Sequence, residues 1–453
     1  MQPYPPLGTI YAASYMRSLG HEVSLHDVMF AHGAEEIRSR IKDEKPDYVV
    51  FYDDGFNWLT KMCLTNMRHA AWGMAKIAKT FGATVIFNSS DSTDHALEYL
   101  NEGADYVIKG EAEHTLKELV EVLANRSKDL KDVLGIVYKS NGGDIVANDK
   151  RPVIRQLDDL PDPAWDLIDI KSYKDRWVNA HGYFSLNMVT TRGCPYKCNW
   201  CAKPIYGNRY NNRSVSRVIT EIERYISDYG VDHIWYCDDI FGLTPGWVQD
   251  FNEQVQKKGL SFRYKIQSRV DLLLTEDTAK CLAESGCDTV WLGAESGSQK
   301  ILDAMDKGIT VDQIYEARPV LKKYGIKCAF FLQFGYLGEE KEDIEATIKM
   351  VLDLEPDEIG VSVSYPLPGT KFYEKVKHEL TNKSNWTDSD DLDLMFSNNY
   401  SNGFYRTLQR YIHKRLEQKK GPRGSVKKII KWPYHVVSSQ YLKAKINQSW
   451  KQR

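Results

Sequence analysis

Three cysteines stand close together near the middle of the chain. They lie in the run TRGCPYKCNWC at positions 191–201, so Cys194, Cys198 and Cys201 have the spacing C-x3-C-x2-C. Three thiolates spaced in this way on one loop can each bind a different iron of a cubane [4Fe-4S] cluster, which leaves the fourth iron without a protein ligand. An amine and a carboxylate of a bound small molecule can chelate that iron, so the motif predicts a catalytic cluster.

A structural zinc ion is the main alternative for these cysteines, with Cys237 as a fourth ligand. Structural zinc prefers four closed tetrahedral ligands, typically from two paired-cysteine knuckles, and Cys237 falls inside a predicted strand. Electron-transfer clusters usually have four cysteine ligands, so they fit the spacing poorly as well. The other cysteines are expected to be ordinary buried thiols: Cys63, Cys281, Cys287 and Cys328.

A strand followed by a helix repeats six times from residue 184 onward. The predicted strands are 184–191, 233–239, 263–269, 289–295, 327–335 and 358–365, and predicted helices include 215–229, 245–258, 276–285 and 340–354. Six such units predict a partial (β/α)6 barrel of the TIM type, in which functional residues gather on loops at the carboxyl ends of the strands. The three cysteines follow the first of these strands.

Residues 7–123 also alternate helices with short apolar strands. We expect a helix at 7–19 and strands at 21–26, 47–52, 83–88 and 105–108, followed by a hairpin at 133–149. This α/β pattern predicts a doubly wound, flavodoxin-like parallel sheet whose ligands bind at the carboxyl ends of the strands. Its first strand is missing, because Met1 stands directly before a proline-rich turn. We therefore expect an N-terminally truncated domain with unpaired strand edges.

Composition places the chain among folded, soluble proteins of two or three domains. Of its 453 residues, 42% are apolar, yet no run approaches the ~18 apolar residues of a membrane-spanning helix and no signal pattern is present. The expected compartment is the cytoplasm. Residues 401–453 contain fourteen Lys and Arg and the single acid Glu417, a basic tail that could touch an anionic surface but is more often a solvated helix face.

The barrel segment resembles the radical S-adenosylmethionine (SAM) superfamily over roughly residues 185–374. Beyond the cysteines, the resemblance rests on Trp200 and on short motifs after successive strands: Asp238-Asp239, Ser268-Arg269, Gly293-Ala294-Glu295-Ser296-Gly297, and Gly335 with Gly338-Glu339-Glu340. A zwitterionic sulfonium ligand needs carboxylates, a cation and closely approaching backbone. The resemblance implies that the following residues contact SAM: Trp200, Asp238, Asp239, Arg269, Glu295, Ser296 and Gly335.

The N-terminal segment resembles the cobalamin-binding domain of one radical SAM class, which includes the anaerobic magnesium-protoporphyrin ester cyclase and the hopanoid methylase. The matching motifs are Pro6-Leu7-Gly8, Gly20-His21-Glu22-Val23, Ala104-Asp105-Tyr106-Val107 and Gly110-Glu111-Ala112-Glu113. The resemblance implies bound cobalamin near Asp53, Asp54, Gly55, Ser89, Ser90, Gly110 and Glu111. The chain lacks the D-x-H-x-x-G sequence that ligates cobalt in some proteins, and His32 is expected to be a surface histidine.

These features predict a radical SAM enzyme that uses a [4Fe-4S] cluster, SAM and cobalamin. The leading hypothesis is methyl transfer to an unactivated carbon of a small molecule. Radical cyclisation or rearrangement without methyl transfer is the alternative, and a nucleic-acid-modifying enzyme or a non-catalytic zinc or iron–sulfur protein is less favoured. An electron donor such as flavodoxin or ferredoxin is implied. The expected segments are a cobalamin-binding-like domain (1–132), a hairpin and linker (133–183), the barrel (184–380) and a basic helical extension (381–453).

Overall fold

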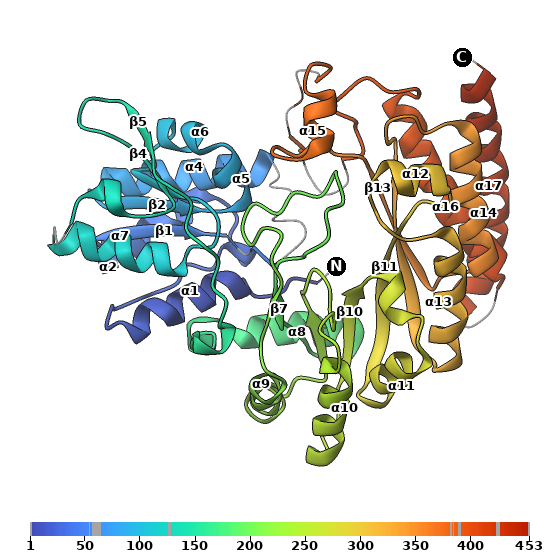
Figure 1. Cartoon of the computed structure of the whole chain (residues 1–453), viewed down its shortest axis with the longest axis horizontal. Helices are drawn as coiled ribbons and strands as arrows, with labels where there is room; N and C mark the ends of the chain where they lie inside the picture. Colours follow the sequence, from blue (N-terminus) through green and yellow to red (C-terminus); the bar gives the residue numbers. More distant parts are fainter. Residues whose placement is uncertain are drawn as a thin grey trace.

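The computed structural model contains two large sheets that lie side by side (Figure 1). It describes residues 2–53, 55–56, 65–125, 128–380, 383, 385–387, 391–422 and 426–451. Within this part of the chain, the first sheet has the strand order β1-β2-β3-β4-β5 and the second has the order β13-β12-β11-β10-β9-β6. Asp54 and Cys63, both singled out from the sequence, lie outside the described residues.

The first sheet combines a parallel part with an antiparallel hairpin. Its strands are β1 (Tyr48–Tyr52), β2 (Thr84–Asn88), β3 (Tyr106–Ile108), β4 (Ile136–Lys139) and β5 (Ile145–Ala147), of which β1 to β3 are parallel. The helices around it are α1 (Leu7–Ser18), α2 (Ile37–Glu44), α4 (Thr65–Thr80), α5 (Ser90–Asp94), α6 (Ala96–Asn101) and α7 (Glu113–Asn125).

Alternating side chains of this sheet divide between two apolar layers. In β2, Val85 and Phe87 pack with α2 and α4, whereas Ile86 packs with α7 on the opposite face. Successive side chains of a strand point to opposite faces, so a strand covered by helices on both faces must be apolar throughout. The predicted doubly wound arrangement is therefore confirmed.

The predicted strand at residues 21–26 is wrong. These residues form no strand, and among the described residues the sheet begins with β1 at its edge. A strand is stable only when its backbone pairs with a neighbour. No described segment pairs with 21–26, so its alternating pattern alone does not produce a strand.

The second sheet is entirely parallel and follows chain order, as the partial barrel requires. Its strands are β6 (Ser185–Met188), β9 (His233–Tyr236), β10 (Arg263–Ser268), β11 (Cys287–Glu295), β12 (Lys327–Phe334) and β13 (Glu358–Val363). The helices outside it are α9 (Val215–Tyr229), α10 (Trp247–Lys258), α11 (Glu276–Glu284), α12 (Gln299–Ala304), α13 (Val311–Lys323) and α14 (Lys341–Leu354). The predicted (β/α)6 barrel is confirmed.

Each barrel strand buries one side in the apolar core and turns the other toward the barrel interior. In β10, Tyr264 and Ile266 belong to the core, whereas Gln267 lines an interior cavity. The barrel thus has an apolar core, and its interior cavity is lined by a few polar side chains together with apolar ones such as Trp291 and Phe331.

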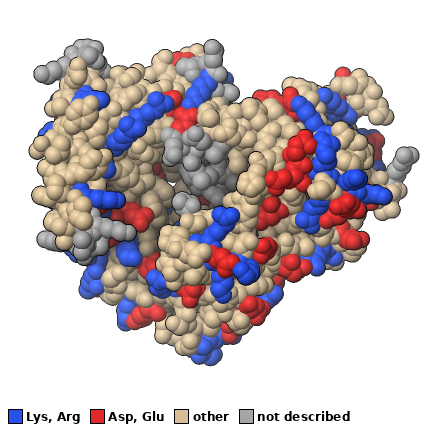
Figure 2. Space-filling model, turned by 180° about the vertical axis from the view of Figure 1, so that it is seen from behind, with Lys and Arg blue, Asp and Glu red and all other residues tan. Residues whose placement is uncertain are grey.

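Shorter elements complete the chain. A linker helix, α8 (Ile170–His181), precedes the barrel, and a two-stranded ribbon, β7 (Thr191–Arg192) with β8 (Asn211–Asn212), brackets the cysteine loop. After α15 (Lys371–Val376), the chain ends in α16 (Asn402–Lys420) and α17 (Val426–Lys451), which lie on the outer flank of the barrel (Figure 1) and confirm the predicted helical extension. Charged side chains are spread over both lobes (Figure 2). Within the described ranges, we find no helix with the length and apolar content to cross a membrane.

Candidate active site

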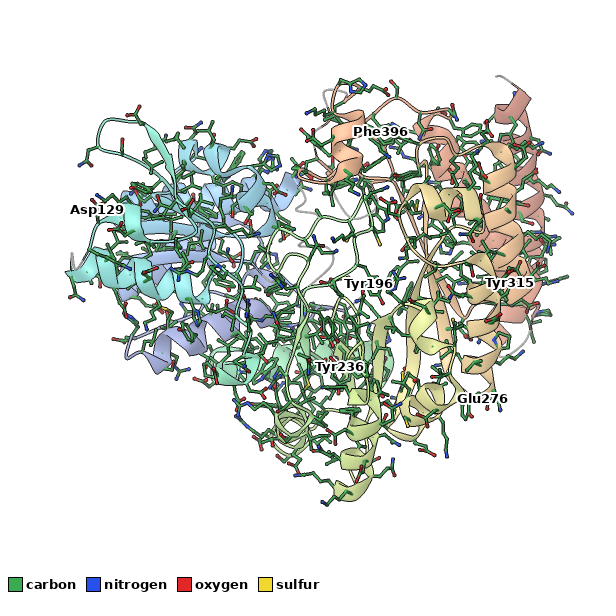
Figure 3. All side chains as sticks on the ribbon, viewed as in Figure 1. Asp129, Tyr196, Tyr236, Glu276, Tyr315 and Phe396 are labelled. Carbon is green, nitrogen blue, oxygen red and sulfur yellow. The ribbon has the colours of Figure 1, made fainter. Side chains whose placement is uncertain are left out.

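One cavity is lined by residues from both sheets. The barrel contributes all three motif cysteines and residues from four strands, and the first unit contributes Gly55 from the loop after β1 and Ser90 from the start of α5. Its volume of about 310 Å³ lies inside the range of roughly 300–1,000 Å³ that is typical of small-molecule sites. Figure 3 shows Tyr196, which lines it, near the centre of the molecule, whereas Glu276 and Tyr315 lie on outer helices.

The cysteine loop is held in a constrained conformation at the mouth of the barrel. Gly193 has a φ of +82°, and a Cβ atom there would collide with the carbonyl oxygen of Arg209. Cys194, Cys198 and Cys201 are half-buried. Burial raises the pKa of the Cys194 thiol, so a positive charge or a metal is needed to hold it as a thiolate.

Asp238 supports this loop from beneath and does not line the cavity. Its carboxylate accepts hydrogen bonds from the backbone N–H groups of Thr190 (2.7 Å) and Thr191 (2.9 Å). Burial raises the pKa of Asp238 to about 6 although these bonds favour the carboxylate. The neighbouring Asp239 does line the cavity.

A buried ion pair stands at the carboxyl end of β11. Lys307 Nζ lies 2.7 Å from Glu295 Oε1, and both side chains are almost fully buried. Glu295 has a φ of +58°, a strained conformation for a residue with a side chain. A Cβ on Gly293 would lie 2.6 Å from Lys307 Nζ, so glycine at that position makes room for the pair.

Arg269 joins the cysteine loop to the loop that carries Lys307. Its guanidinium donates to the carbonyl oxygens of Lys307 (3.0 Å) and Gly308 (3.1 Å), and its carbon Cζ lies 3.6 Å from the centroid of the Tyr196 ring. Asp271 accepts two further bonds from it. Arg269 therefore holds two loops in position while it faces the cavity.

Two buried serine hydroxyls on the cavity wall have no hydrogen-bond partner among the described residues. Ser268 Oγ comes from the end of β10 and Ser90 Oγ from the first residue of α5. The indole N–H of Trp200 is a third group of this kind. A buried polar group without a partner costs about 1–3 kcal/mol, so these groups fit a bound ligand that would supply the missing bonds.

Close packing joins the first sheet to the cysteine loop. A Cβ on Gly110 would lie 3.4 Å from the carbonyl oxygen of Ile205, and one on Gly55 would lie 3.5 Å from Tyr206 Oη. The Asn88 side chain donates to the carbonyl oxygens of Ile108 and Gly110 and ties the ends of β2 and β3 together. The carboxyl edge of this sheet thus faces the barrel mouth.

Arg192 makes the most deeply buried ionic link between the two units. Its guanidinium lies 2.5 Å from Glu111 and 2.7 Å from Glu113, and all three side chains are at most 4% exposed. Tyr11, Phe56 and Tyr206 surround it with aromatic rings. Burial is the main cause that raises the pKa of Glu111. We call Arg192, Glu111 and Glu113 the Arg192 cluster.

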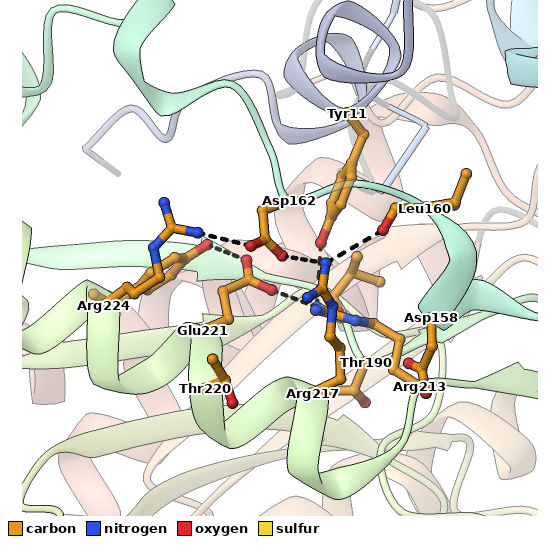
Figure 4. A network of polar contacts seen from close by, with 12 residues as sticks. Tyr11, Asp158, Leu160, Asp162, Thr190, Arg213, Arg217, Thr220, Glu221 and Arg224 are labelled. Carbon is orange, nitrogen blue, oxygen red and sulfur yellow. Dashed lines mark hydrogen bonds and ion pairs between the residues drawn. The ribbon is translucent and has the colours of Figure 1, made fainter. Parts of the chain in front are cut away.

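A second buried arginine, Arg213, also contacts Tyr11, at its hydroxyl (Figure 4). Arg213 lies 2.6 Å from Glu221 and donates to Tyr11 Oη (3.2 Å) and to the carbonyl oxygen of Val189 (3.1 Å). We call Arg213, Glu221 and Tyr11 the Arg213 cluster. At its rim, Asp162 pairs with Arg217 and Arg224 at 2.7 Å each.

The structure brings only part of the sequence-predicted set to the cavity. Cavity-lining members are Cys194, Cys198, Cys201, Trp200, Asp239, Arg269, Glu295, Gly55 and Ser90. Members placed beside it or beneath it are Asp53, Asp238, Ser89, Ser296, Gly110, Glu111 and Gly335. Ser89, for example, caps α5, and the N–H of Gly335 donates to Glu339 Oε2.

Sequence reasoning missed several polar residues of the cavity. Lys307 stands in a loop between two helices and carries no signal of its own. Gln267 and Gln333 did carry a signal in the sequence. Buried parallel strands are mostly apolar, so a polar side chain inside one indicates a functional role.

The residues at the mouth suit an iron–sulfur cubane better than a single ion. No group of three or more His, Cys, Asp or Glu side chains in the described part of the chain converges as a single-ion site requires. A cubane needs wider spacing, because each thiolate binds a different iron. Cys237, the candidate fourth zinc ligand, is buried in the core and does not line the cavity.

Comparison with known proteins identifies both units. Residues 188–351 match the radical SAM superfamily and residues 2–120 match the B12 binding domain. The chain is 33% identical to an uncharacterised methyltransferase of Pyrococcus horikoshii, over 84% of this chain and 81% of that one. It is 25% identical to an anaerobic magnesium-protoporphyrin IX monomethyl ester cyclase of Cereibacter sphaeroides, over 83% of this chain and 61% of that one.

A solved structure shares the whole arrangement. The cobalamin-dependent SAM radical enzyme OxsB with bound aqua-cobalamin superposes with a TM-score of 0.75 at 17% identity, over 97% of this chain and 70% of that one. At this identity the likeness concerns the fold, and the sequence matches carry the family. The chain belongs to the cobalamin-dependent enzymes of the radical SAM superfamily, whose cofactors are a [4Fe-4S] cluster, SAM and cobalamin.

Proposed function

We propose that this protein transfers a methyl group from SAM to an unactivated carbon of a small-molecule substrate. The observation that carries the proposal is one cavity whose wall bears two buried hydroxyls without a partner among the described residues, Ser268 from the barrel and Ser90 from α5. Methyl transfer through cobalamin requires SAM and the substrate to meet beside cobalamin, and residues of both units line this cavity. When bound, the cluster supplies the electron that splits SAM to a 5′-deoxyadenosyl radical, and cobalamin supplies a methyl-carrying centre.

The barrel wall would bind the cluster and SAM. Cys194, Cys198 and Cys201 hold the cluster. The Glu295–Lys307 pair places a carboxylate and an ammonium side by side at the cavity, and these complement the ammonium and carboxylate of the methionine moiety. Ser268 and Asp239 complete the polar contacts.

The first sheet would hold cobalamin through Gly55 and Ser90. Glycine allows the close approach of a bulky ligand, and the Ser90 hydroxyl offers an unpaired donor. Asp53, Ser89, Gly110 and Glu111 remain proposed cobalamin contacts, although none of them lines the cavity. Glu111 in particular is engaged with Arg192.

Aromatic and aliphatic residues would keep water from the reacting atoms. Trp291, Phe331, Tyr365 and Leu392 line the cavity together with its few polar groups. A dry wall protects a reactive carbon radical from side reactions. It also indicates a substrate with a sizeable apolar part.

The test is anaerobic incubation of the reconstituted full-length protein with SAM and a reductant. We expect both 5′-deoxyadenosine and S-adenosylhomocysteine, the second at about one equivalent per cobalamin before any substrate is added. Cyclisation without methyl transfer would give 5′-deoxyadenosine and no S-adenosylhomocysteine, which would replace this proposal with the alternative that the cyclase relative supports.

Two cysteine variants separate the chemistry from general damage. Cys198→Ala should abolish 5′-deoxyadenosine, because the cluster loses a ligand. Cys281→Ala, at a buried thiol on α11 away from the cavity, should keep it. Equal activity in both variants would mean that Cys198 is not a ligand of the cluster.

Further parts of the proposal concern partners and place. A flavodoxin or ferredoxin would supply the electron, and reduced flavodoxin should then replace a chemical reductant in the assay. We place the enzyme in the cytoplasm, the compartment in which such donors work. The domain limits 1–132, 133–183, 184–380 and 381–453 also remain proposals, which limited proteolysis would test.

A further inference from the structure

The last helix exposes a continuous apolar stripe. On α17, Ile430, Tyr434, Val437 and Tyr441 recur at intervals of three and four residues, and their exposed fractions are 72%, 61%, 66% and 59%. This spacing places all four on one face of a helix. Ile429 adds to the stripe at its start. Elsewhere among the described residues, exposed large apolar side chains occur singly or in pairs.

The opposite face of α17 is firmly attached to the protein. Ile446 is 1% exposed, Ser439 Oγ donates to Gln418 Oε1 (2.8 Å), and the Trp432 indole donates to the Gln418 carbonyl oxygen (3.1 Å). The apolar stripe therefore points outward because the other face is already packed on α16. A helix with both faces apolar must cover something on its second face.

Positive charge surrounds the stripe. Residues 426–453 contain six lysines, one arginine and no acid. Lys414 of α16 lies with Nζ 4.6 Å from the Tyr434 ring centroid, and Lys445 lies 4.8 Å from that of Tyr441. From behind, this flank shows Lys and Arg among uncharged side chains and few acidic ones (Figure 2).

We propose that α17 docks the enzyme on the surface of an anionic lipid bilayer. Ile430 and Val437 would enter the boundary between headgroups and acyl chains. Tyr434 and Tyr441 would lie at headgroup level, where amphipathic rings are favoured. The lysines would pair with lipid phosphates. The apolar side chains therefore match the acyl-chain boundary, the tyrosines match the headgroup level, and the lysines match the phosphates.

Two other occupants fit the same face less well. Symmetric pairing with a second copy would bring two acid-free, lysine-bearing helices together, and like charges repel. Nucleic acid would be attracted by the lysines, but its backbone offers nothing to Ile430 and Val437. An anionic bilayer satisfies both the charge and the apolar stripe.

Vesicle flotation of the full-length holoenzyme tests the proposal. The probes are vesicles of phosphatidylcholine alone and vesicles in which about one-third is phosphatidylglycerol. We expect binding to the anionic vesicles only, weakening as salt is raised. Ile430→Ser with Val437→Ser should lower the partition coefficient at least about tenfold. Lys431→Gln with Lys445→Gln should lower it by about the same factor at low salt.

The matched control is Leu97→Ser, which removes an apolar side chain of α6 that is 53% exposed. This control should bind vesicles as the wild type does, and circular dichroism should show that all variants are folded. Absence of flotation with anionic vesicles overturns the proposal. If the wild type is a dimer that Val437→Ser converts to a monomer, a second copy of the chain is the occupant. If binding to polyuridylic acid survives loss of the stripe, nucleic acid is the occupant.

Discussion

Both the Arg192 cluster and the Arg213 cluster contact Tyr11, yet they balance charge differently. Arg213 faces one carboxylate, Glu221, and its Nη1 also donates to two neutral oxygens. Arg192 faces two carboxylates, at 2.5 and 2.7 Å, and Glu113 Oε2 has no further partner among the described groups. The Arg213 cluster is neutral and lies where the barrel wall contacts α1. The Arg192 cluster has one carboxyl more than it has cations, and it lies between the two units.

This difference makes the Arg192 cluster the more costly of the two clusters to bury. Removing two carboxylates and a guanidinium from water costs several kcal/mol per ion, and close pairing offsets that cost only when every charge is compensated. The raised pKa of Glu111 is the sign that compensation is incomplete. Arg192 is therefore the group on which the junction depends, two residues ahead of Cys194.

Arg192→Met should give the largest effect. The variant leaves Glu111 and Glu113 buried side by side without a cation, so we expect a loss of about 5 kcal/mol in the free energy of unfolding, the upper end for a broken buried pair. Urea unfolding followed by tryptophan fluorescence measures it.

A compensating variant shows whether charge is the cause. Arg192→Met with Glu111→Gln and Glu113→Gln removes the charges together and should recover most of the loss. If the triple variant is as unstable as Arg192→Met, the packing of the guanidinium among Tyr11, Phe56 and Tyr206 is what matters.

Arg213→Met should cost less, about 3 kcal/mol, because it leaves only Glu221 without its cation. The same urea titration gives the comparison. A loss equal to that of Arg192→Met would mean that the surplus carboxyl of the Arg192 cluster is protonated in the folded state and does not repel.

Glu339 shows what a buried carboxyl does without an arginine. Burial raises its pKa to about 8, and its one close bond is from the Gly335 N–H at 2.7 Å. Because the pKa of Glu339 is higher in the folded chain than in the unfolded chain, protonation of this carboxyl stabilises the fold. That stabilisation is complete below pH 4 to 5 and is lost as the pH rises through 8. We expect the wild type to lose about 2 kcal/mol of stability from this group between pH 6 and pH 8.

Glu339→Gln tests that expectation, because glutamine does not titrate. The variant should lack this component of the pH dependence in urea unfolding and should gain on the wild type as the pH rises. Parallel pH profiles for the two proteins would place the pKa of Glu339 near its ordinary value.

Local patterns predicted the barrel well because each of its units is local. The helix expected at 215–229 is α9, Val215–Tyr229, and all six strands appear within a few residues of their predicted limits. The strand at 21–26 failed because strand formation depends on a partner elsewhere in the chain. Periodicity reports which side chains are apolar and says nothing of which backbone lies alongside.

The site was predictable where a motif has a fixed spacing and unpredictable where contacts span the chain. The three cysteines reach one cavity because they share one loop. Glu111 was interpreted as a cofactor contact, but it pairs with Arg192, which is 81 residues away. Lys307 joins Glu295 through a loop whose course depends on Arg269. Such pairings depend on the packed fold and leave no local pattern.

The smallest effect is expected at the rim of the Arg213 cluster. Asp162 pairs there with Arg217 and Arg224, but these side chains are 27%, 32% and 45% exposed. Water solvates all three groups and screens their attraction, so Asp162→Asn should cost less than about 1 kcal/mol in urea unfolding. Added salt should shrink the difference further. A loss as large as that of Arg213→Met would mean that burial of the ions does not set their energetic weight at this junction, and the contrast between the two clusters would then lose its physical basis.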